Sequence, residues 1–216
     1  MAFSHEWDKA YKNSCQMSKW PWSDLVSYVM RLNLAQNLKV LEIGCGAGAN
    51  IPFFLDLEVE YFAIEGSETI VSQIKRKYPR LSNRIVKGDF TTELPFCHKF
   101  DLVVDRSALT HNDTSAIQES IRLIQNKLQK GGYFIGIDWF STLHSNANDG
   151  YEVDSYTRSN CQGQFKGVGK VHFSDKHHLY KLFKDFSFLK LEHKVIETIV
   201  PRSHNFAAWN FILQKK

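Results

Sequence analysis

Short apolar runs alternate with amphipathic stretches over residues 39–140 of the chain. Five of these runs are bounded by Gly, Asp or Asn, as buried parallel strands commonly are. They cover residues 39–44, 60–66, 83–89, 100–106 and 132–139. Strands that alternate with helical stretches predict a doubly wound α/β sheet.

The stretches between the strands have helical spacing. The longest, residues 113–132, has Gly131 placed to end the helix. One face of this helix carries Ile117, Ile121, Ile124 and Leu128.

The pattern changes in the last third of the chain. Residues 174–186 predict a helix that begins at a Ser174 cap, and residues 188–200 and 205–216 alternate as two strands joined by a turn. A C-terminal antiparallel hairpin therefore closes a mostly parallel, Rossmann-like sheet. The prediction is one domain over residues 1–216.

Composition adds few constraints. The chain has 216 residues, 43% of them hydrophobic, and a net charge of +4, which suits an anionic substrate but not a dedicated nucleic-acid binder. Its cysteines form no CxxC pair, so neither a metal site nor a disulfide framework is predicted; they are Cys15, Cys45, Cys97 and Cys161. The N-terminus has no apolar signal region and no stretch is long enough to span a membrane, so a cytoplasmic protein is expected.

The stretch VLEIGCGAGANIPFF at residues 40–54 carries three glycines behind the first strand. Gly44, Gly46 and Gly48 fall in the first strand–helix turn, where ligands bind doubly wound sheets. Glycine allows positive φ and close approach to the backbone, and the next helix offers free N–H groups. A nucleoside-bearing ligand is the preferred interpretation; a turn that serves only packing is the alternative.

The residues around this turn indicate the type of cofactor. The G-x-G-x-G spacing, with Glu42 two residues ahead, differs from the G-x-G-x-x-G of dinucleotide sites. Glu65 ends the second strand, where an acid can accept hydrogen bonds from both ribose hydroxyls. Asp89 ends the third strand and could receive an adenine amine, with Phe90 beside the ring, although an exposed turn acid is also possible at Asp89.

These motifs resemble the class I S-adenosylmethionine-dependent methyltransferases. The resemblance covers residues 36–140, with VLEIGCGAG, AIEGS, KGDF, FDLVVDRSALTH and LQKGGYFIGID in the family's order. It implies a seven-stranded sheet with one antiparallel strand and S-adenosylmethionine as cofactor. It assigns the glycines to the methionine and ribose, Glu65 to the ribose, Asp89 and Phe90 to the adenine, and Asp105 to the border of methionine and substrate. Glu42 belongs to the same predicted site.

Methyl transfer to an alcohol requires removal of the hydroxyl proton. Three residues near the ends of the fourth and fifth strands are candidate catalytic groups: His111, His144 and Asp138. The histidines could instead be ordinary surface residues, and Asp138 could cap or orient a neighbour.

Two segments outside the shared motifs are expected to specify the substrate. Residues 140–173 form a long polar connection whose Arg158 and Lys166 suggest a polar, anionic small molecule; a merely decorative insertion is the alternative. Residues 1–36 form a helical segment with the aromatic residues Trp7, Tyr11, Trp20 and Trp22. It could fold over the cofactor as a lid or pack against the sheet.

Nucleic acid is not the predicted substrate. DRSA replaces the N-P-P-Y loop of amino-methylating DNA enzymes, no Pro-Cys dipeptide is present, and the basic run 75–80 suits a solvated helix end. A weaker resemblance to methyltransferases of bacterial surface-polysaccharide assembly favours O-methylation of a nucleotide-linked or polysaccharide-bound sugar. Phenols, other small metabolites, a protein or RNA acceptor, and a non-catalytic S-adenosylmethionine-binding module stay open.

Overall fold

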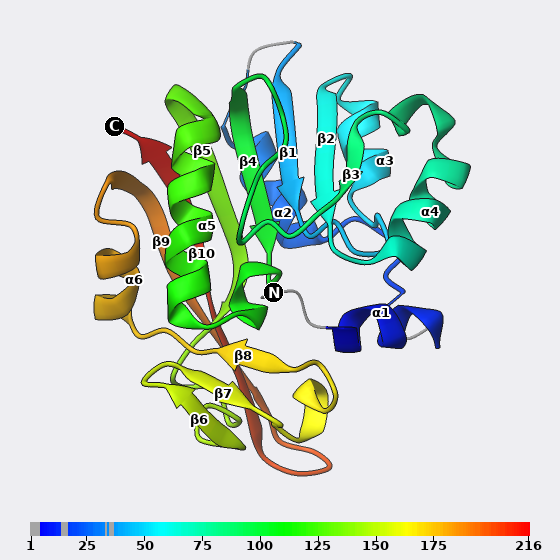
Figure 1. Ribbon diagram of the computed structural model, residues 1–216. Helices are drawn as coiled ribbons and strands as arrows, with labels where there is room; N and C mark the ends of the chain where they lie inside the picture. Colours follow the sequence, from blue (N-terminus) through cyan, green and yellow to red (C-terminus); the bar gives the residue numbers. More distant parts are fainter. Residues whose placement is uncertain (1–4, 14–16, 33, 35–36) are drawn as a thin grey trace.

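A seven-stranded sheet forms the centre of the molecule in the computed structural model, which describes residues 5–13, 17–32, 34 and 37–216 (Figure 1). The strand order is β3-β2-β1-β4-β5-β10-β9. The strands are β1 (Lys39–Ile43), β2 (Glu60–Glu65), β3 (Ile85–Lys87), β4 (Phe100–Arg106), β5 (Leu128–Phe140), β9 (Phe186–Thr198) and β10 (His204–Lys215). Strands β1 to β5 are parallel, and β10 runs antiparallel to both β5 and β9. The predicted sheet with its C-terminal hairpin is confirmed.

Helices cover both faces of this sheet (Figure 1). The α-helices are α1 (His5–Lys12), α2 (Ser23–Met30), α3 (Ile51–Asp56), α4 (Glu68–Lys77), α5 (Thr114–Lys127) and α6 (Lys176–Leu182). Short 3-10 helices lie at η1 (Pro79–Leu81), η2 (Leu109–His111) and η3 (Gly163–Phe165). No helix in the described part of the chain is long and apolar enough to cross a membrane.

The alternation of side chains along β1 and β4 explains the two faces. Leu41 and Val103 join the core beneath α5 and α6, whereas Val40 and Leu102 join the core beneath α2, α3 and α4. Both faces are apolar because both are covered, as is typical of parallel sheets.

Two predicted helix ends need correction. Helix α5 stops at Lys127, so Leu128 begins β5 instead of continuing the helical face. Helix α6 is capped by Asp175, whose Oδ1 accepts the His178 N–H at 2.7 Å, and not by Ser174. Ser174 instead forms a β-bridge with Ser141.

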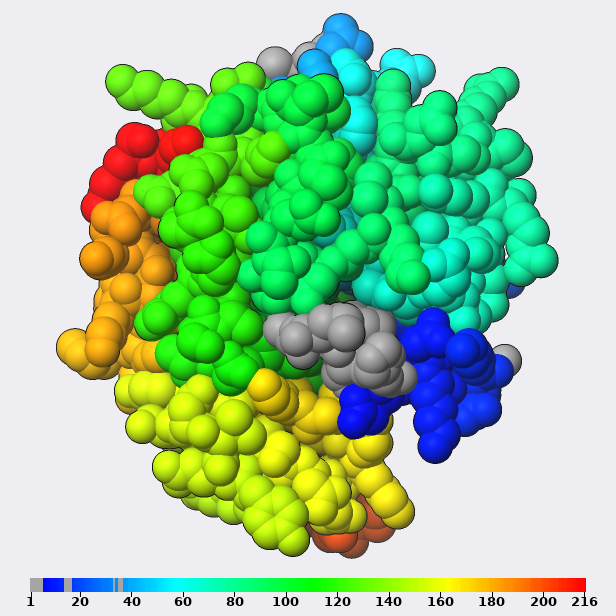
Figure 2. Space-filling view, in the orientation of Figure 1, coloured from blue at the N-terminus to red at the C-terminus, as the bar shows by residue number. Residues whose placement is uncertain are grey.

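The connection at 140–173 is folded into a second sheet. Strands β6 (Tyr151–Asp154), β7 (Thr157–Ser159) and β8 (Lys170–His172) pair in the order β6-β7-β8, all antiparallel. In Figure 2 this segment (yellow) forms a lobe beside α1 (blue). The sequence analysis predicted a long polar connection here without strands of its own; these short polar strands are stabilised by docking onto α5 and η2.

Candidate cofactor and acceptor site

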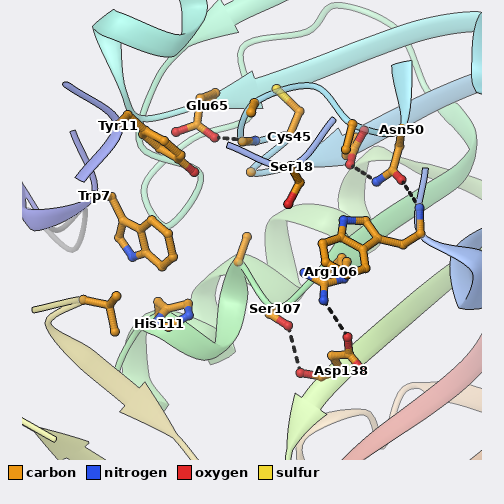
Figure 3. Close-up of a pocket in the computed structure, with 18 of the residues that line it drawn as sticks. Trp7, Tyr11, Ser18, Cys45, Asn50, Glu65, Arg106, Ser107, His111 and Asp138 are labelled. Atoms are coloured by element: carbon orange, nitrogen blue, oxygen red, sulfur yellow. Dashed lines mark hydrogen bonds and ion pairs between the residues drawn. The ribbon is translucent and has the colours of Figure 1, made fainter. Parts of the chain in front are cut away.

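A cavity of about 300 Å³ lies at the carboxyl edge of the sheet, where the strand order reverses between β1 and β4. Figure 3 shows Glu65 and Tyr11 on one side of it, with Ser107 and Asp138 on the other. Its wall includes Trp7 and Tyr11 of α1, Phe140 of β5 and Phe206 of β10. One cavity therefore joins the turn after β1 to the insertion and the N-terminal helix.

The glycine turn has the backbone that its sequence predicts. Gly44, Gly46 and Gly48 all have positive φ, at 62°, 49° and 76°. A Cβ on Gly44 would lie 2.3 Å from the Cβ of Ala108, and one on Gly48 would lie 2.8 Å from Ile51 Cδ1. Glycine is thus required here by the chain's own fold, in addition to any ligand. Gly44 and Gly46 line the cavity.

Glu65 is buried at the end of β2 with its carboxylate held in place. Its Oε2 accepts the Gly46 N–H and its Oε1 accepts the Ser67 N–H, each at 2.9 Å. Burial raises the pKa of Glu65, and these N–H groups oppose that shift. Each carboxylate oxygen can accept more than one hydrogen bond, so the residue fits the predicted acceptance of ribose hydroxyls.

Glu42 joins the glycine turn to the N-terminal segment. Its carboxylate accepts hydrogen bonds from Asn50 Nδ2 at 2.8 Å and from the Tyr61 hydroxyl at 2.5 Å. Asn50 Oδ1 in turn accepts the Trp22 N–H at 3.2 Å. Burial raises the pKa of Glu42 to about 7. Glu42 and Asn50 both line the cavity, and the sequence analysis had given Asn50 no role.

The residues predicted to contact the adenine and the methionine part of the cofactor do not all line the cavity. Phe90 lines it, but Asp89 does not, and Asp89 Oδ1 accepts hydrogen bonds from the Thr91 N–H and hydroxyl. Asp105 lies buried behind η2, where its Oδ1 accepts the N–H groups of Ala108 and Leu109 at 3.0 and 3.1 Å. Burial raises the pKa of Asp105 to about 7. The ligand roles of Asp89 and Asp105 stay predictions.

Asp138 lines the cavity with both carboxylate oxygens in ion pairs. Its Oδ2 is 2.8 Å from Arg106 Nη2, and its Oδ1 is 2.5 Å from Lys194 Nζ. The Arg106 guanidinium carbon lies 3.3 Å from the centre of the Trp22 ring. Asp138 also has a left-handed backbone, with φ of 54°, two residues before β5 ends. The arrangement corresponds to the orienting role considered for Asp138.

Arg106 is a cavity residue that the sequence analysis missed. Its position next to Asp105 at the end of β4 was the available signal, because alternate residues at a strand end face opposite sides of the sheet. Its stacking on Trp22 joins distant parts of the chain and has no signal in the sequence.

The two candidate histidines lie in different surroundings. His111 lines the cavity, and its Nδ1 is 3.1 Å from the carbonyl oxygen of Lys170. His144 is 3% exposed and lies outside the cavity lining, among the rings of Phe140, Phe165 and Phe206. Burial lowers the pKa of each histidine to about 4.

The insertion presents a different chemistry from the one predicted. Its cavity residues beyond Phe140 are Gln164, Phe165 and Val168. Arg158 instead donates hydrogen bonds to the carbonyl oxygens of Asp154 and Thr157, and Lys166 does not line the cavity. The two cations from which a polar, anionic small molecule was predicted thus do not line the cavity, because one is held inside the small sheet and the other faces solvent.

The N-terminal segment contributes three of its four predicted aromatic residues to the cavity: Trp7, Tyr11 and Trp22. Trp20 is 75% exposed. Helix α1 is held against the start of α4, because Asp8 accepts hydrogen bonds from the Ser67 hydroxyl at 2.5 Å and the Thr69 N–H at 3.3 Å. This is a place from which a lid could act, and its movement stays a prediction.

Comparisons with known proteins agree with this geometry. Residues 40–132 match a methyltransferase domain model. No curated protein sequence gives a significant match. A solved structure of an S-adenosylmethionine-dependent methyltransferase from Methanosarcina mazei is similar, with a TM-score of 0.69 and 16% identity over 87% of this chain and 96% of that one.

Two similar structures contain S-adenosylhomocysteine. The N-methyltransferase NodS from Bradyrhizobium japonicum WM9 has a TM-score of 0.61 and 16% identity, with 89% of this chain and 86% of that chain covered. The 1,6-didemethyltoxoflavin-N1-methyltransferase from Burkholderia thailandensis, solved with that acceptor, has a TM-score of 0.60 and 17% identity, with 89% and 77% covered.

In agreement with the predicted resemblance, residues 40–132 match a methyltransferase domain, and the chain has the fold of solved S-adenosylmethionine-dependent methyltransferases.

Proposed function

We propose that the chain methylates a hydroxyl group of a small molecule, with His111 as the general base. The observation that carries this proposal is the single cavity that contains both the Glu65 turn and His111. Bound S-adenosylmethionine would supply an electrophilic methyl group. The glycine turn and Glu65 would hold its nucleoside, and the wall around His111 would receive the acceptor.

His111 is placed for proton removal because its ring lines the cavity. Burial lowers its pKa to about 4, so the imidazole is unprotonated at neutral pH; a base of this pKa is intrinsically weak and would contribute mainly through its position. Asp138 is a weaker candidate because Arg106 and Lys194 already occupy its two oxygens. His144 is separated from the cavity by its ring neighbours.

A sugar hydroxyl, nucleotide-linked or polysaccharide-bound, is the acceptor that the sequence resemblance favours. The structure supports a second candidate, a hydroxyl on a planar aromatic ring. Phe140 and Phe165 meet edge to face at 4.7 Å in the cavity wall, and Trp7 lies 4.8 Å from His111. Flat apolar molecules gain most from such a wall. One similar structure, the 1,6-didemethyltoxoflavin-N1-methyltransferase, contains bound 1,6-didemethyltoxoflavin.

The test is release of S-adenosylhomocysteine by the purified chain with sugar nucleotides, oligosaccharides and hydroxylated aromatic acids as acceptors. Turnover with one class and not the others identifies the acceptor. Binding of S-adenosylmethionine without methyl transfer to any acceptor would favour the non-catalytic binding module. Methylation at a nitrogen of a mixed acceptor would contradict the O-methylation part of the proposal.

A further inference from the structure

A backbone carbonyl of the small sheet β6–β8 contacts the imidazole of His111, although this sheet is separate from the seven-stranded sheet. Strand β8 is an edge strand of that sheet and packs against η2, which carries His111. The Lys170 carbonyl oxygen lies 3.1 Å from His111 Nδ1. The insertion therefore contacts the proposed base through its backbone, in addition to lining the acceptor end of the cavity.

This contact determines the tautomer of His111. A carbonyl oxygen only accepts hydrogen bonds, so Nδ1 must carry the proton and donate it. In a neutral imidazole the other nitrogen, Nε2, is then the basic atom. The rings of Trp7 and Phe140 lie edge to face with the imidazole at 4.8 and 5.9 Å, so its orientation is also restricted. Figure 3 shows His111 on the cavity wall beneath Trp7.

Two carboxylates hold the sheet β6–β8 against the start of α5. One belongs to the cap of α5 and the other to β6. Asp113 caps α5 through Oδ1, which accepts the Ala116 N–H at 3.0 Å, and its Oδ2 pairs with Lys170 Nζ at 2.5 Å. Asp154 of β6 accepts the Thr114 N–H and hydroxyl, each at 2.9 Å. The ion pair thus acts on the same residue whose carbonyl holds the imidazole.

We infer that the β6–β8 insertion sets the tautomer of the catalytic base, with Asp113 as a positioning residue that acts through Lys170. The Asp113–Lys170 pair keeps the Lys170 carbonyl on Nδ1, which leaves Nε2 free to take the acceptor's proton. This inference rests on the proposed role of His111. Among the described residues, no hydrogen bond joins His111 Nε2 to another group, so this nitrogen is available to a substrate.

The tautomer can be measured without turnover. In protein labelled with 15N-histidine, the His111 signals, assigned by their loss in His111→Gln, should show a protonated Nδ1 and an unprotonated Nε2 at pH 7. Asp113→Asn keeps an amide oxygen for the helix cap but removes the charge that holds Lys170. Its His111 signals should shift toward a mixture of tautomers, and Lys170→Met should give the same change from the other partner.

Kinetics provide the second readout. If the productive tautomer is populated in about one molecule in ten, kcat should fall about tenfold while KM and cofactor affinity stay the same. The matched control is Glu152→Gln, which removes the 3.7 Å ion pair with Arg158 on the same small sheet and touches no group near His111. It should leave both the spectrum and kcat unchanged.

Three results would overturn the inference: a protonated Nε2 in the wild-type protein, an unchanged tautomer in both folded variants, or a loss of kcat without any change in the His111 signals. Failure of the proposed function looks different. In that case the chain transfers no methyl group to any acceptor, although the Nδ1–H tautomer and its dependence on Asp113 are present in the spectrum.

Discussion

Gly44 lies directly against Ala108, so that a Cβ built on Gly44 would sit 2.3 Å from the Cβ of Ala108. Gly44 directly follows β1 and has φ of 62°, and Ala108 directly precedes η2 after β4. The two adjacent strand ends at the switch point can therefore approach each other only where one of them has no side chain. This approach places the glycine turn beside the turn that carries His111.

Gly44→Ala should destabilise the fold by about 2–5 kcal/mol, since a left-handed alanine costs about 1–2 kcal/mol and an overpacked contact adds about 1–3 kcal/mol. Adding Ala108→Gly should recover the packing part but not the backbone part. Gly167→Ala is the matched control, because Gly167 has φ of 77° and open space around its position. Urea unfolding measures all four proteins. A double variant no more stable than Gly44→Ala would show that the collision is not the cause.

Glu65→Ala should weaken binding of S-adenosylhomocysteine by roughly 10- to 150-fold, from the loss of charge-assisted hydrogen bonds worth about 1.5–3 kcal/mol. The structure adds a second reason, because the Gly46 N–H loses the carboxylate that fixes it at 2.9 Å. Calorimetry measures the affinity. Glu68→Ala, which removes an exposed acid paired with Lys87, is the control and should bind normally. An unchanged affinity in folded Glu65→Ala protein would exclude Glu65 from the cofactor site.

The central sheet and part of the site were readable from the sequence because they depend on local patterns. The strands β1, β2 and β4 are apolar runs with sharp ends, and Glu65 is found by its place at the end of β2. Strands β6 to β8 lack such runs, and the hydrogen bonds from Thr114 to Asp154 that dock them are long-range. A local pattern contains no information about such a contact.

The acceptor wall was hidden for the same reason. Phe165 and Val168 are two apolar residues in a polar stretch, and only the fold shows that they face the cavity and that Arg158 does not. His111 and His144 look equivalent in sequence, since each follows the end of a strand. Their difference arises from the packing of Phe140, Phe165 and Phe206 around His144.

Asp138 and Lys194 should be energetically coupled. Asp138→Ala leaves Lys194 and Arg106 without the carboxylate that both contact. Removing one partner of a fully buried ion pair lowers the free energy of unfolding by about 3–5 kcal/mol. Because Lys194 keeps part of its exposure and a second partner in Asp24, a smaller loss of about 2 kcal/mol is expected. A double-mutant cycle with Lys194→Ala measures the coupling by urea unfolding. Additive effects would show that the pair contributes nothing.

His172 should make stability depend on acid pH. It is buried between the hydroxyls of Thr157 and Ser174, at 3.0 and 3.1 Å from its two nitrogens, and burial lowers its pKa to about 3. The unfolded chain binds a proton below its ordinary pKa of 6.5, whereas the folded chain does not until about pH 3. The stability linked to the neutral ring is therefore present above pH 6.5 and is lost as the pH falls toward 3.

The measurement compares His172→Gln with the wild type by urea unfolding between pH 7 and pH 4. The difference in unfolding free energy should be largest at pH 7 and should shrink by up to about 1.4 kcal/mol per pH unit below 6.5. His177→Gln, at an exposed position of α6, is the control for the substitution itself. A constant difference for His172→Gln would mean that folding does not lower the pKa of this ring.

His111 and His144 should differ sharply in their effect on turnover. His111 lines the cavity with Nδ1 held by the Lys170 carbonyl, whereas His144 lies outside the cavity lining and its Nδ1 accepts the Asn146 N–H at 3.1 Å. An alcohol is a poor nucleophile until its proton leaves, and a placed base contributes roughly 10²–10⁴-fold. With an acceptor in hand, His111→Gln should lower kcat at least about tenfold at unchanged cofactor affinity.

His144→Gln is the matched control, since it removes an imidazole whose pKa is also lowered to about 4, from outside the cavity. It should reduce stability, because a polar amide replaces a buried ring, while kcat per folded molecule stays near the wild-type value. A large loss of kcat in His144→Gln with normal folding would reverse the assignment. Normal kcat in both variants would leave alignment of the acceptor as the main source of rate, because neither imidazole would then be removing the proton.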